Sequence, residues 1–168
     1  ILTADRIESG KMEHTGEHAD PAAVIATLIS DVHIIADKKR VSLRYDPPDI
    51  PCPALAIDSQ HLRTVLQNLV ENAVQYSRDG GEVVIRVACR DKSAEISVTD
   101  AGIGIPRQLQ QHIFSRFYRA ENAVRAVTEG TGLGLYIAKR IVEREGGTIT
   151  FTSEEGVGTT FVVKLPAA

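Results

Sequence analysis

Three glycines at alternate positions, Gly130, Gly132 and Gly134, lead directly into a helical pattern. Glycine adopts backbone angles that are closed to other residues and leaves its amide exposed. The free amides of the first helical turn and the positive end of the helix dipole would face this loop, where they would stabilise a polyphosphate. The spacing predicts a phosphate-binding loop, although it is neither a P-loop nor the GxGxxG of dinucleotide folds. A glycine-rich turn before a core helix is the alternative.

Two asparagines, Asn68 and Asn72, lie four residues apart and therefore share one face of a helix whose other side is apolar. Gln75 and Tyr76 extend this face. An amide oxygen is a hard, neutral ligand suited to Mg²⁺, which proteins hold through a few oxygens together with substrate phosphates. The pair predicts a metal-assisted phosphate site, with solvent-facing amides as the alternative.

Asp100 stands at the end of a predicted strand, directly before Gly102 and Gly104. A carboxylate there can accept a hydrogen bond from an exocyclic amine such as that of adenine, while the glycines let a flat ring approach the backbone. Taken alone, an Asp before a glycine turn is more often ordinary turn chemistry.

The stretch from residue 113 to residue 119 gathers three aromatic side chains and two arginines, in a chain with only eight Phe or Tyr residues. A guanidinium is the side chain of choice for a terminal phosphate, and aromatic residues can latch a neighbouring loop. Residues 119–128 are polar and without strong periodicity, so we predict a mobile loop there. The alternative for the aromatic residues is a place in the core.

Apolar periodicity assigns these residues to a small set of elements. Asp20 and Pro21 start an amphipathic helix whose apolar face includes Ile35. The other predicted elements are a strand at 41–45, a proline-rich connector, a short strand at 54–57, a helix at 59–77, strands at 82–90 and 93–100, a short helix at 107–114, the helix after the glycines, and strands at 148–152 and 159–165. Together they predict an α+β two-layer sandwich, with a mostly antiparallel sheet of about five strands packed against about three helices.

The composition is that of one globular domain: 168 residues, 43% hydrophobic and 24% charged. A net charge of -3 with interspersed signs gives no basic surface for nucleic acid. No apolar run reaches the length of a membrane span. The chain begins without Met inside a helical pattern, so we expect it to be part of a longer protein.

The two cysteines, Cys52 and Cys89, are far apart in the sequence, and neither belongs to a metal-binding cluster. We therefore predict two reduced thiols in a cytosolic compartment. The five histidines are scattered without metal-ligand spacing, and we predict surface or capping roles for all of them; they are His14, His18, His33, His61 and His112.

Five motifs in series resemble the N box, the F box and the three glycine boxes of sensor histidine kinases, which belong to the GHKL ATPase superfamily with its Bergerat fold. They are Asn-Leu-Val-Glu-Asn-Ala at 68–73, Asp-Ala-Gly-Ile-Gly-Ile at 100–105, Phe-Ser-Arg-Phe-Tyr-Arg at 114–119, Gly-Thr-Gly-Leu-Gly-Leu at 130–135 and Gly-Thr-Thr-Phe at 158–161. Residues 5–11 are similar to the tail of the second dimerization helix in that family. We therefore expect residues 1–15 to end this helix and residues 16–168 to form the ATP-binding catalytic domain.

The resemblance implies an Mg-ATP site with a role for each matched position. Asn72 would be the Mg²⁺ ligand and, with Arg119 near the γ-phosphate, would carry catalysis, while Asp100 would bind the adenine amine. The other residues expected to contact ATP, beneath a lid spanning roughly 108–131, are Asn68, Gln75, Tyr76, Gly102, Gly104, Ile105, Tyr118, Gly130, Thr131, Gly132, Leu133, Gly134, Leu135 and Thr160.

The implied reaction transfers the γ-phosphoryl group to a histidine of the dimerization domain, from which an aspartate of a cognate response regulator takes it. The chain holds no phosphoacceptor motif, and Gln75 stands where many members carry a Lys. We expect a cytoplasmic location, either free or as part of a membrane-bound sensor, with this chain monomeric and the whole kinase a homodimer.

Two alternatives remain. One is a GHKL domain that hydrolyses ATP, which would want a glutamate where Asn68 stands. The other is an ATP-sensing module that performs no transfer.

Overall fold

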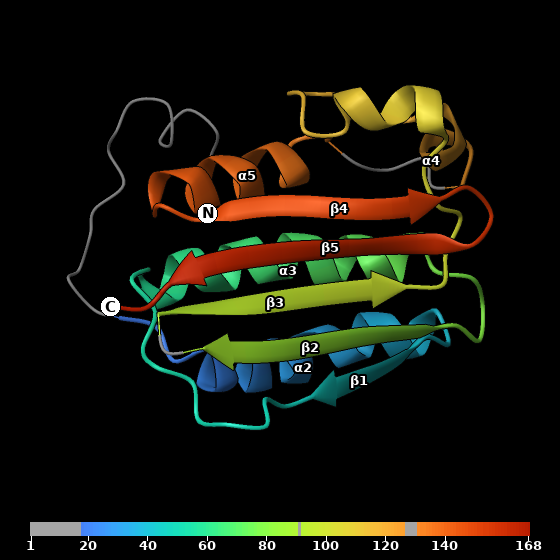
Figure 1. The fold of residues 1–168 in the computed structure, drawn as a ribbon. Coiled ribbons are helices and arrows are strands. Elements are labelled where there is room, and N and C mark those ends of the chain that lie inside the picture. Colours follow the sequence, from blue (N-terminus) through green and yellow to red (C-terminus); the bar gives the residue numbers. More distant parts are fainter. Residues whose placement is uncertain (1–17, 91, 127–130) are drawn as a thin grey trace.

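The fold is a sheet with helices packed on one of its faces (Figure 1). The computed structural model describes residues 18–90, 92–126 and 131–168. Three longer helices pack against the sheet: α2 (Pro21–Lys38), α3 (Ser59–Tyr76) and α5 (Gly134–Arg144). The predicted α+β two-layer sandwich is confirmed. Within the described residues, no helix is both long and apolar enough to cross a membrane.

The sheet has five strands in the order β1-β2-β3-β5-β4. The strands are β1 (Ser42–Asp46), β2 (Glu82–Arg90), β3 (Ser93–Asp100), β4 (Thr148–Glu154) and β5 (Gly158–Pro166). β1 runs parallel to β2, and every other neighbouring pair is antiparallel. Alternate residues of β2, among them Val83, Ile85 and Val87, are buried in the core between sheet and helices. The mixed, mostly antiparallel sheet follows the prediction.

The helices begin where capping residues occur in the sequence. Asp20 accepts hydrogen bonds from the amides of Ala22 and Ala23, and Pro21 occupies the first position of α2. Asp58 accepts from the amide of Gln60 at 2.7 Å and caps α3. α3 contacts both α2 and α5 and buries a continuous apolar stripe: Leu62, Val65, Leu66, Leu69, Val70, Ala73 and Val74. This burial fixes the rotation of α3 and thereby sets the direction of its asparagine face.

Four local predictions are corrected by the structure. The segment 119–128, predicted as a loop, contains α4 (Glu121–Ala126) in its described part. The predicted helix 107–114 is a 3-10 helix, η1 (Arg107–His112). In the predicted strand 54–57 only Leu55 forms isolated bridges, since the prolines before it cannot donate to a ladder. Ile35 is 50% exposed because α2 packs through Ala36, beside it.

The prediction of two separate reduced thiols is wrong. Cys52 and Cys89 form a disulfide with a Cα–Cα distance of 5.2 Å across 37 residues of sequence. Their separation in the sequence does not predict this pairing, because the proline-rich connector continues from β1 in the direction of β2 and brings Cys52 to Cys89. The pair comes together only through the sheet pairing.

The surface role predicted for the histidines is wrong for His61. This residue is 4% exposed in the first turn of α3, and its Nδ1 lies 3.1 Å from Oε1 of the buried Glu145 at the end of α5. His18, His33 and His112 are exposed, as predicted. His14 lies outside the described residues.

Candidate functional site

A cavity of about 270 Å³ lies between α3, the loop after β3, the F-box segment and the start of α5. Small-molecule sites begin at about 300 Å³, so the size suits part of a nucleotide. It draws together most of the residues predicted from four of the motifs: Asn68, Asn72, Gln75, Tyr76, Asp100, Gly104, Ile105, Tyr118, Arg119, Thr131, Gly132, Gly134 and Leu135. The cavity lining runs from Asn68 to Phe161, so residues far apart in the sequence share one site.

The asparagine face of α3 forms one wall. The Asn68 amide nitrogen donates to the Thr64 carbonyl at 2.9 Å, which fixes the side chain against its own helix. A Cβ at Gly134 would lie 2.7 Å from the Asn68 Oδ1, so Asn68 packs directly on the start of α5. Among the described residues, Asn72 has no hydrogen-bond partner for its amide. Asn68 therefore positions the glycine loop, and Asn72 presents its amide to the cavity.

The loop after β3 is held between α3 and the β4–β5 turn. The Ile103 amide donates to the Tyr76 carbonyl at 3.1 Å, and the Gly156 amide donates to the Ile103 carbonyl at 2.8 Å. Gly104 has φ +63, and a Cβ there would meet the Glu154 carbonyl oxygen at 1.9 Å. Only glycine fits at this approach. The loop is thus clamped on both sides, and it turns Ile103 and Ile105 into the cavity.

Asp100 lies at the polar floor of this loop. Its carboxylate accepts hydrogen bonds from the amides of Gly102, at 2.9 Å, and Thr159. Burial raises the pKa of Asp100 from 3.8 to about 6, and the two amide hydrogen bonds oppose this rise only in part. At neutral pH the group is a desolvated carboxylate, which gains from any further donor that enters the cavity.

The start of α5 supplies hydrogen-bond donors to the cavity, whereas Asp100 supplies an acceptor. Leu133, its N-cap, makes no side-chain hydrogen bond to the first turn, so this cap leaves room for another acceptor at the amides of Gly134 and Leu135. Gly134 and Leu135 from this turn line the cavity. Gly132 has φ +68, and a Cβ there would lie 2.7 Å from the Phe117 carbonyl carbon, so the glycine loop rests on the F-box backbone. An uncapped helix N-terminus facing a cavity is a site for anions.

The F-box segment closes the cavity with Tyr118, Arg119 and Ala120. Phe114 packs edge-on against Phe151 and Phe161 and anchors the segment to the sheet. Phe117, by contrast, is 65% exposed under the Arg116 guanidinium, 5.0 Å from its ring centroid. The aromatic residues therefore divide between core and surface.

The structure corrects the position predicted for Thr160 in the third glycine box. Thr160 hydroxyl faces Thr99 Oγ1 at 3.0 Å on the open face of the sheet, and its neighbour Thr159 lines the cavity instead. The reason is the two-residue alternation of β5, in which Thr159 and Phe161 point to the helices.

Two of the predicted ATP-contacting residues support the cavity from behind and do not line it, and a third lies outside the described residues. A Cβ at Gly102 would meet the Tyr76 carbonyl oxygen at 2.3 Å, so this glycine lets α3 approach the loop. Leu133 packs against the core. Gly130 is outside the described residues, as are residues 1–15 with their predicted dimerization helix.

Several lining residues were missed from the sequence. Glu71 follows from the helix period, since it lies three residues after Asn68 and four before Gln75. Ala73 and Ile103 lie beside predicted site residues, and the others are brought to the cavity by the fold: Ile113, Ala120, Ala123, Thr159 and Phe161. Glu71 Oε1 accepts from the Gln67 amide nitrogen at 2.7 Å. Lys39 is a further cation near this end of α3, where its ammonium donates to the Gln75 carbonyl. Lys39 does not line the cavity, so the lining has no cation at position 75.

The fold and the cavity define a nucleotide-binding α+β domain, and the comparisons with known proteins identify its family. The model of the family described as histidine kinase-, DNA gyrase B-, and HSP90-like ATPase matches residues 57–168. The chain therefore belongs to this family of ATPases, as the five motifs predicted.

Similar proteins extend the match to nearly the whole chain. The sensor-like histidine kinase SenX3 of Mycobacterium tuberculosis (strain ATCC 25618 / H37Rv) is 35% identical over 169 residues, which cover 99% of this chain and 40% of SenX3. The sensor protein SrrB of Staphylococcus aureus (strain NCTC 8325 / PS 47) is 41% identical over 111 residues, covering 65% of this chain and 19% of SrrB. The chain thus spans about two fifths of the length of SenX3.

Solved structures agree with the fold. The mycobacterial sensor histidine kinase MprB has 30% sequence identity and a TM-score of 0.79, with 89% of this chain and 97% of that chain covered. Full-length ShkA in complex with AMPPNP gives a TM-score of 0.81 at 24% identity, covering 98% of this chain and 34% of ShkA, and supports the fold alone.

Proposed function

We propose that this chain is the ATP-binding catalytic domain of a sensor histidine kinase, which transfers the γ-phosphoryl group of ATP to a histidine of a dimerization domain. One observation supports this most. A single cavity combines a partly buried carboxylate at Asp100, the amide of Asn72 and the start of α5, which has no side-chain cap. These are the groups that a base amine, a phosphate-bound cation and a polyphosphate require.

The base would bind at the clamped loop. Asp100 would accept a hydrogen bond from the exocyclic amine of adenine, and the side chains of Ile103 and Ile105 would cover the ring. Guanine places a carbonyl where adenine has its amine, so a carboxylate there disfavours it. This arrangement supports adenine selectivity.

The phosphates would extend toward α5. The amides of Gly134 and Leu135 would donate to phosphate oxygens, and the positive end of the helix dipole would stabilise their charge. Arg119 would neutralise the γ-phosphate. Because phosphoryl transfer requires little covalent work from the protein, the rate depends on this positioning and charge neutralisation.

Asn72 is the residue that we expect to hold Mg²⁺. The described residues contain no group of three or more His, Cys, Asp or Glu that could form a closed metal site. The oxygens of Asn72 and Glu71 in the cavity suit a cation that takes only one or two protein ligands beside substrate phosphates. When bound, the ion would neutralise charge on the phosphates.

The remaining assignments follow from the proposed reaction. The phosphoacceptor histidine would lie in a dimerization domain that residues 1–15 end, and a response regulator aspartate would receive the phosphoryl group. The use of ATP and of a response regulator would place the domain in the cytoplasm, and the whole kinase would act as a homodimer. No nucleic-acid partner is proposed.

ATP hydrolysis is the second candidate, and Glu71 is the observation that favours it. Its carboxylate lines the cavity beside Asn72, where it could orient a water. Its hydrogen bond from Gln67 holds it along α3, however, and Asn68 occupies the position one turn earlier.

Incubation with γ-labelled ATP separates these functions. We expect the chain, mixed with a dimerization domain of its own kinase, to place acid-labile label on that domain, whereas release of labelled inorganic phosphate alone would favour hydrolysis. ATP binding without either product would support an ATP-sensing module. Asp79→Asn, on the surface and paired with Arg40, is a matched control that should not change the outcome.

A further inference from the structure

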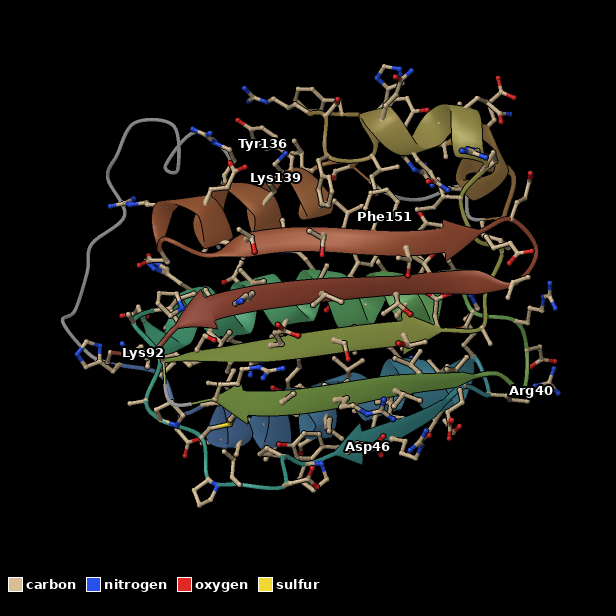
Figure 2. The ribbon with its side chains drawn as sticks, in the orientation of Figure 1. Arg40, Asp46, Lys92, Tyr136, Lys139 and Phe151 are labelled. Atoms are coloured by element: carbon tan, nitrogen blue, oxygen red, sulfur yellow. A yellow bond between two sulfur atoms is a disulfide. The ribbon has the colours of Figure 1, made fainter. Side chains whose placement is uncertain are left out.

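The Cys52–Cys89 disulfide lies at the end of the sheet opposite the nucleotide cavity. Cys89 pairs with Ala94 of β3, whereas Asp100 of the cavity ends the same strand. Six residues of strand separate the two positions, which is about 20 Å. Figure 2 shows the disulfide as a yellow bond near the end of β2. A change at the disulfide therefore leaves the nucleotide contacts untouched.

The disulfide holds one half of the connector that joins β1 to α3, residues 47–58. β1 pairs only with the Glu82–Arg86 part of β2, so the connector continues past the rest of that strand. In the described chain, residues 47–53 form no backbone hydrogen bond with another segment, and four of the seven are prolines without an amide donor. The sulfur bridge is thus the specific link between this half of the connector and the sheet.

The other half of the connector, residues 54–57, holds the start of the domain. The Ala19 amide donates to the carbonyls of Leu55 at 3.1 Å and Ile57 at 2.9 Å, and the Leu55 amide donates back to the Ala19 carbonyl at 2.9 Å. All three residues are buried. Ala19 directly precedes the cap of α2, so these hydrogen bonds fix the point where the chain arrives from residues 1–17.

The disulfide lies at the edge of the core and not inside it. Cys52 and Cys89 are partly exposed at the edge of the core. In an ATP-containing cytoplasm, glutathione and thioredoxin keep thiols reduced, and the disulfides that do form there are mostly transient and redox-sensing. This step rests on the proposed function, since that function places the domain in this compartment.

We propose that Cys52 and Cys89 form a reversible thiol–disulfide exchange site that takes a dithiol as reductant, and that its redox state sets how firmly residues 54–57 hold Ala19. A thiolate of the dithiol attacks one sulfur, the Sγ–Sγ bond breaks, and a mixed disulfide forms. The second thiolate of the dithiol then displaces the remaining cysteine. Two electrons and two protons pass to the protein, which gains two thiols, and the dithiol becomes a disulfide.

The functional consequence concerns the tether of the catalytic domain. In the proposed kinase, the catalytic domain would swing toward the phosphoacceptor histidine, and Ala19 lies near the start of the described residues. A clamped connector restricts that swing, and a reduced connector frees it. The site would therefore regulate transfer without altering ATP affinity.

The test equilibrates the folded chain in mixtures of reduced and oxidised dithiothreitol, counts free thiols with a maleimide reagent, and follows amide hydrogen exchange. We expect no free thiols in the oxidising mixture, two in the reducing one, and full reversibility. Reduction should raise exchange at Ala19 and Leu55 at least tenfold and lower the Tm by on the order of 10 °C, because the bridge closes a loop of 37 residues. The affinity for a fluorescent ATP analogue should change less than twofold.

The double variant Cys52→Ser, Cys89→Ser is the control, since reductant should not affect it. Two free thiols under oxidising conditions, a disulfide that resists dithiothreitol until the chain unfolds, or unchanged exchange at Ala19 would each overturn the proposal. If the chain bound the ATP analogue in neither redox state, the proposed function would be refuted. The hydrogen-exchange measurement would still test the proposed role of the disulfide.

Discussion

Replacing Asp100 with Asn should make the domain more stable and its ATP binding weaker. The carboxylate is partly buried, and its pKa is raised to about 6 because burial disfavours its charged form. Asn keeps an acceptor oxygen for the amides of Gly102 and Thr159 but carries no charge. The substitution therefore removes a cost of folding together with a recognition group.

The expected gain in stability follows from the pKa. Because the folded-state pKa lies above the ordinary 3.8, the folded chain binds more protons than the unfolded chain between about pH 4 and pH 6. The free energy of unfolding therefore falls as the pH rises through that window. A difference of about two units between the folded and unfolded pKa values corresponds to roughly 3 kcal/mol of unfolding free energy. Partial exposure of the carboxylate screens its charge, so we expect Asp100→Asn to gain about 1–2 kcal/mol at pH 7.5 and almost nothing at pH 4.

Urea denaturation at pH 4, 5, 6 and 7.5 measures this gain, and titration with ATP and GTP measures recognition. We expect the ATP affinity to fall by about 1–3 kcal/mol, as for a lost hydrogen bond to a charged group, with a smaller effect on GTP. A variant that is less stable than the wild type at pH 7.5, or that loses ATP and GTP affinity equally, would refute the reasoning.

Other predictions concern the metal ligand and the glycines. Asn72→Ala should abolish the Mg²⁺-dependent part of ATP binding and leave the Tm within a few degrees, because the side chain faces the cavity. A fluorescent ATP analogue titrated with and without Mg²⁺ measures this. An unchanged Mg²⁺ dependence would exclude the metal role. Gly104→Ala should be far more damaging than Gly146→Ala. Both glycines have positive φ, but a new Cβ meets a carbonyl oxygen only at Gly104. Gly146→Ala should therefore lower the free energy of unfolding, measured by urea denaturation, by about 1–2 kcal/mol, and Gly104→Ala should lower it clearly more. Equal losses would contradict the packing described for the loop.

Periodicity and capping predict most of the fold from the sequence. Asp20 and Asp58 mark the starts of α2 and α3, and the alternation from Val83 to Val98 gives the central hairpin. These signals are local, which is why one sequence suffices. The short α4 was not predicted, because six residues are too few to show an apolar stripe at helical spacing.

The candidate site is also predictable where its residues belong to local motifs. Asn72, Asp100 and Gly134 meet in one cavity although they come from three elements. What the sequence cannot give is the choice between neighbours on a strand, such as Thr159 against Thr160, when the register is unknown. Pairings between distant residues are equally hidden, and the Cys52–Cys89 bridge depends on the path of a proline-rich connector that has no periodicity.

The most direct test of the nucleotide site is a titration of isotopically labelled chain with a non-hydrolysable ATP analogue and Mg²⁺, followed by NMR. The proposed site predicts the largest amide shifts at residues 68–76, 100–105 and 131–135, with little change around Lys92 at the opposite end of the sheet. Shifts centred on the open face of the sheet, or no shifts at millimolar analogue, would contradict the nucleotide site on which the proposed function rests.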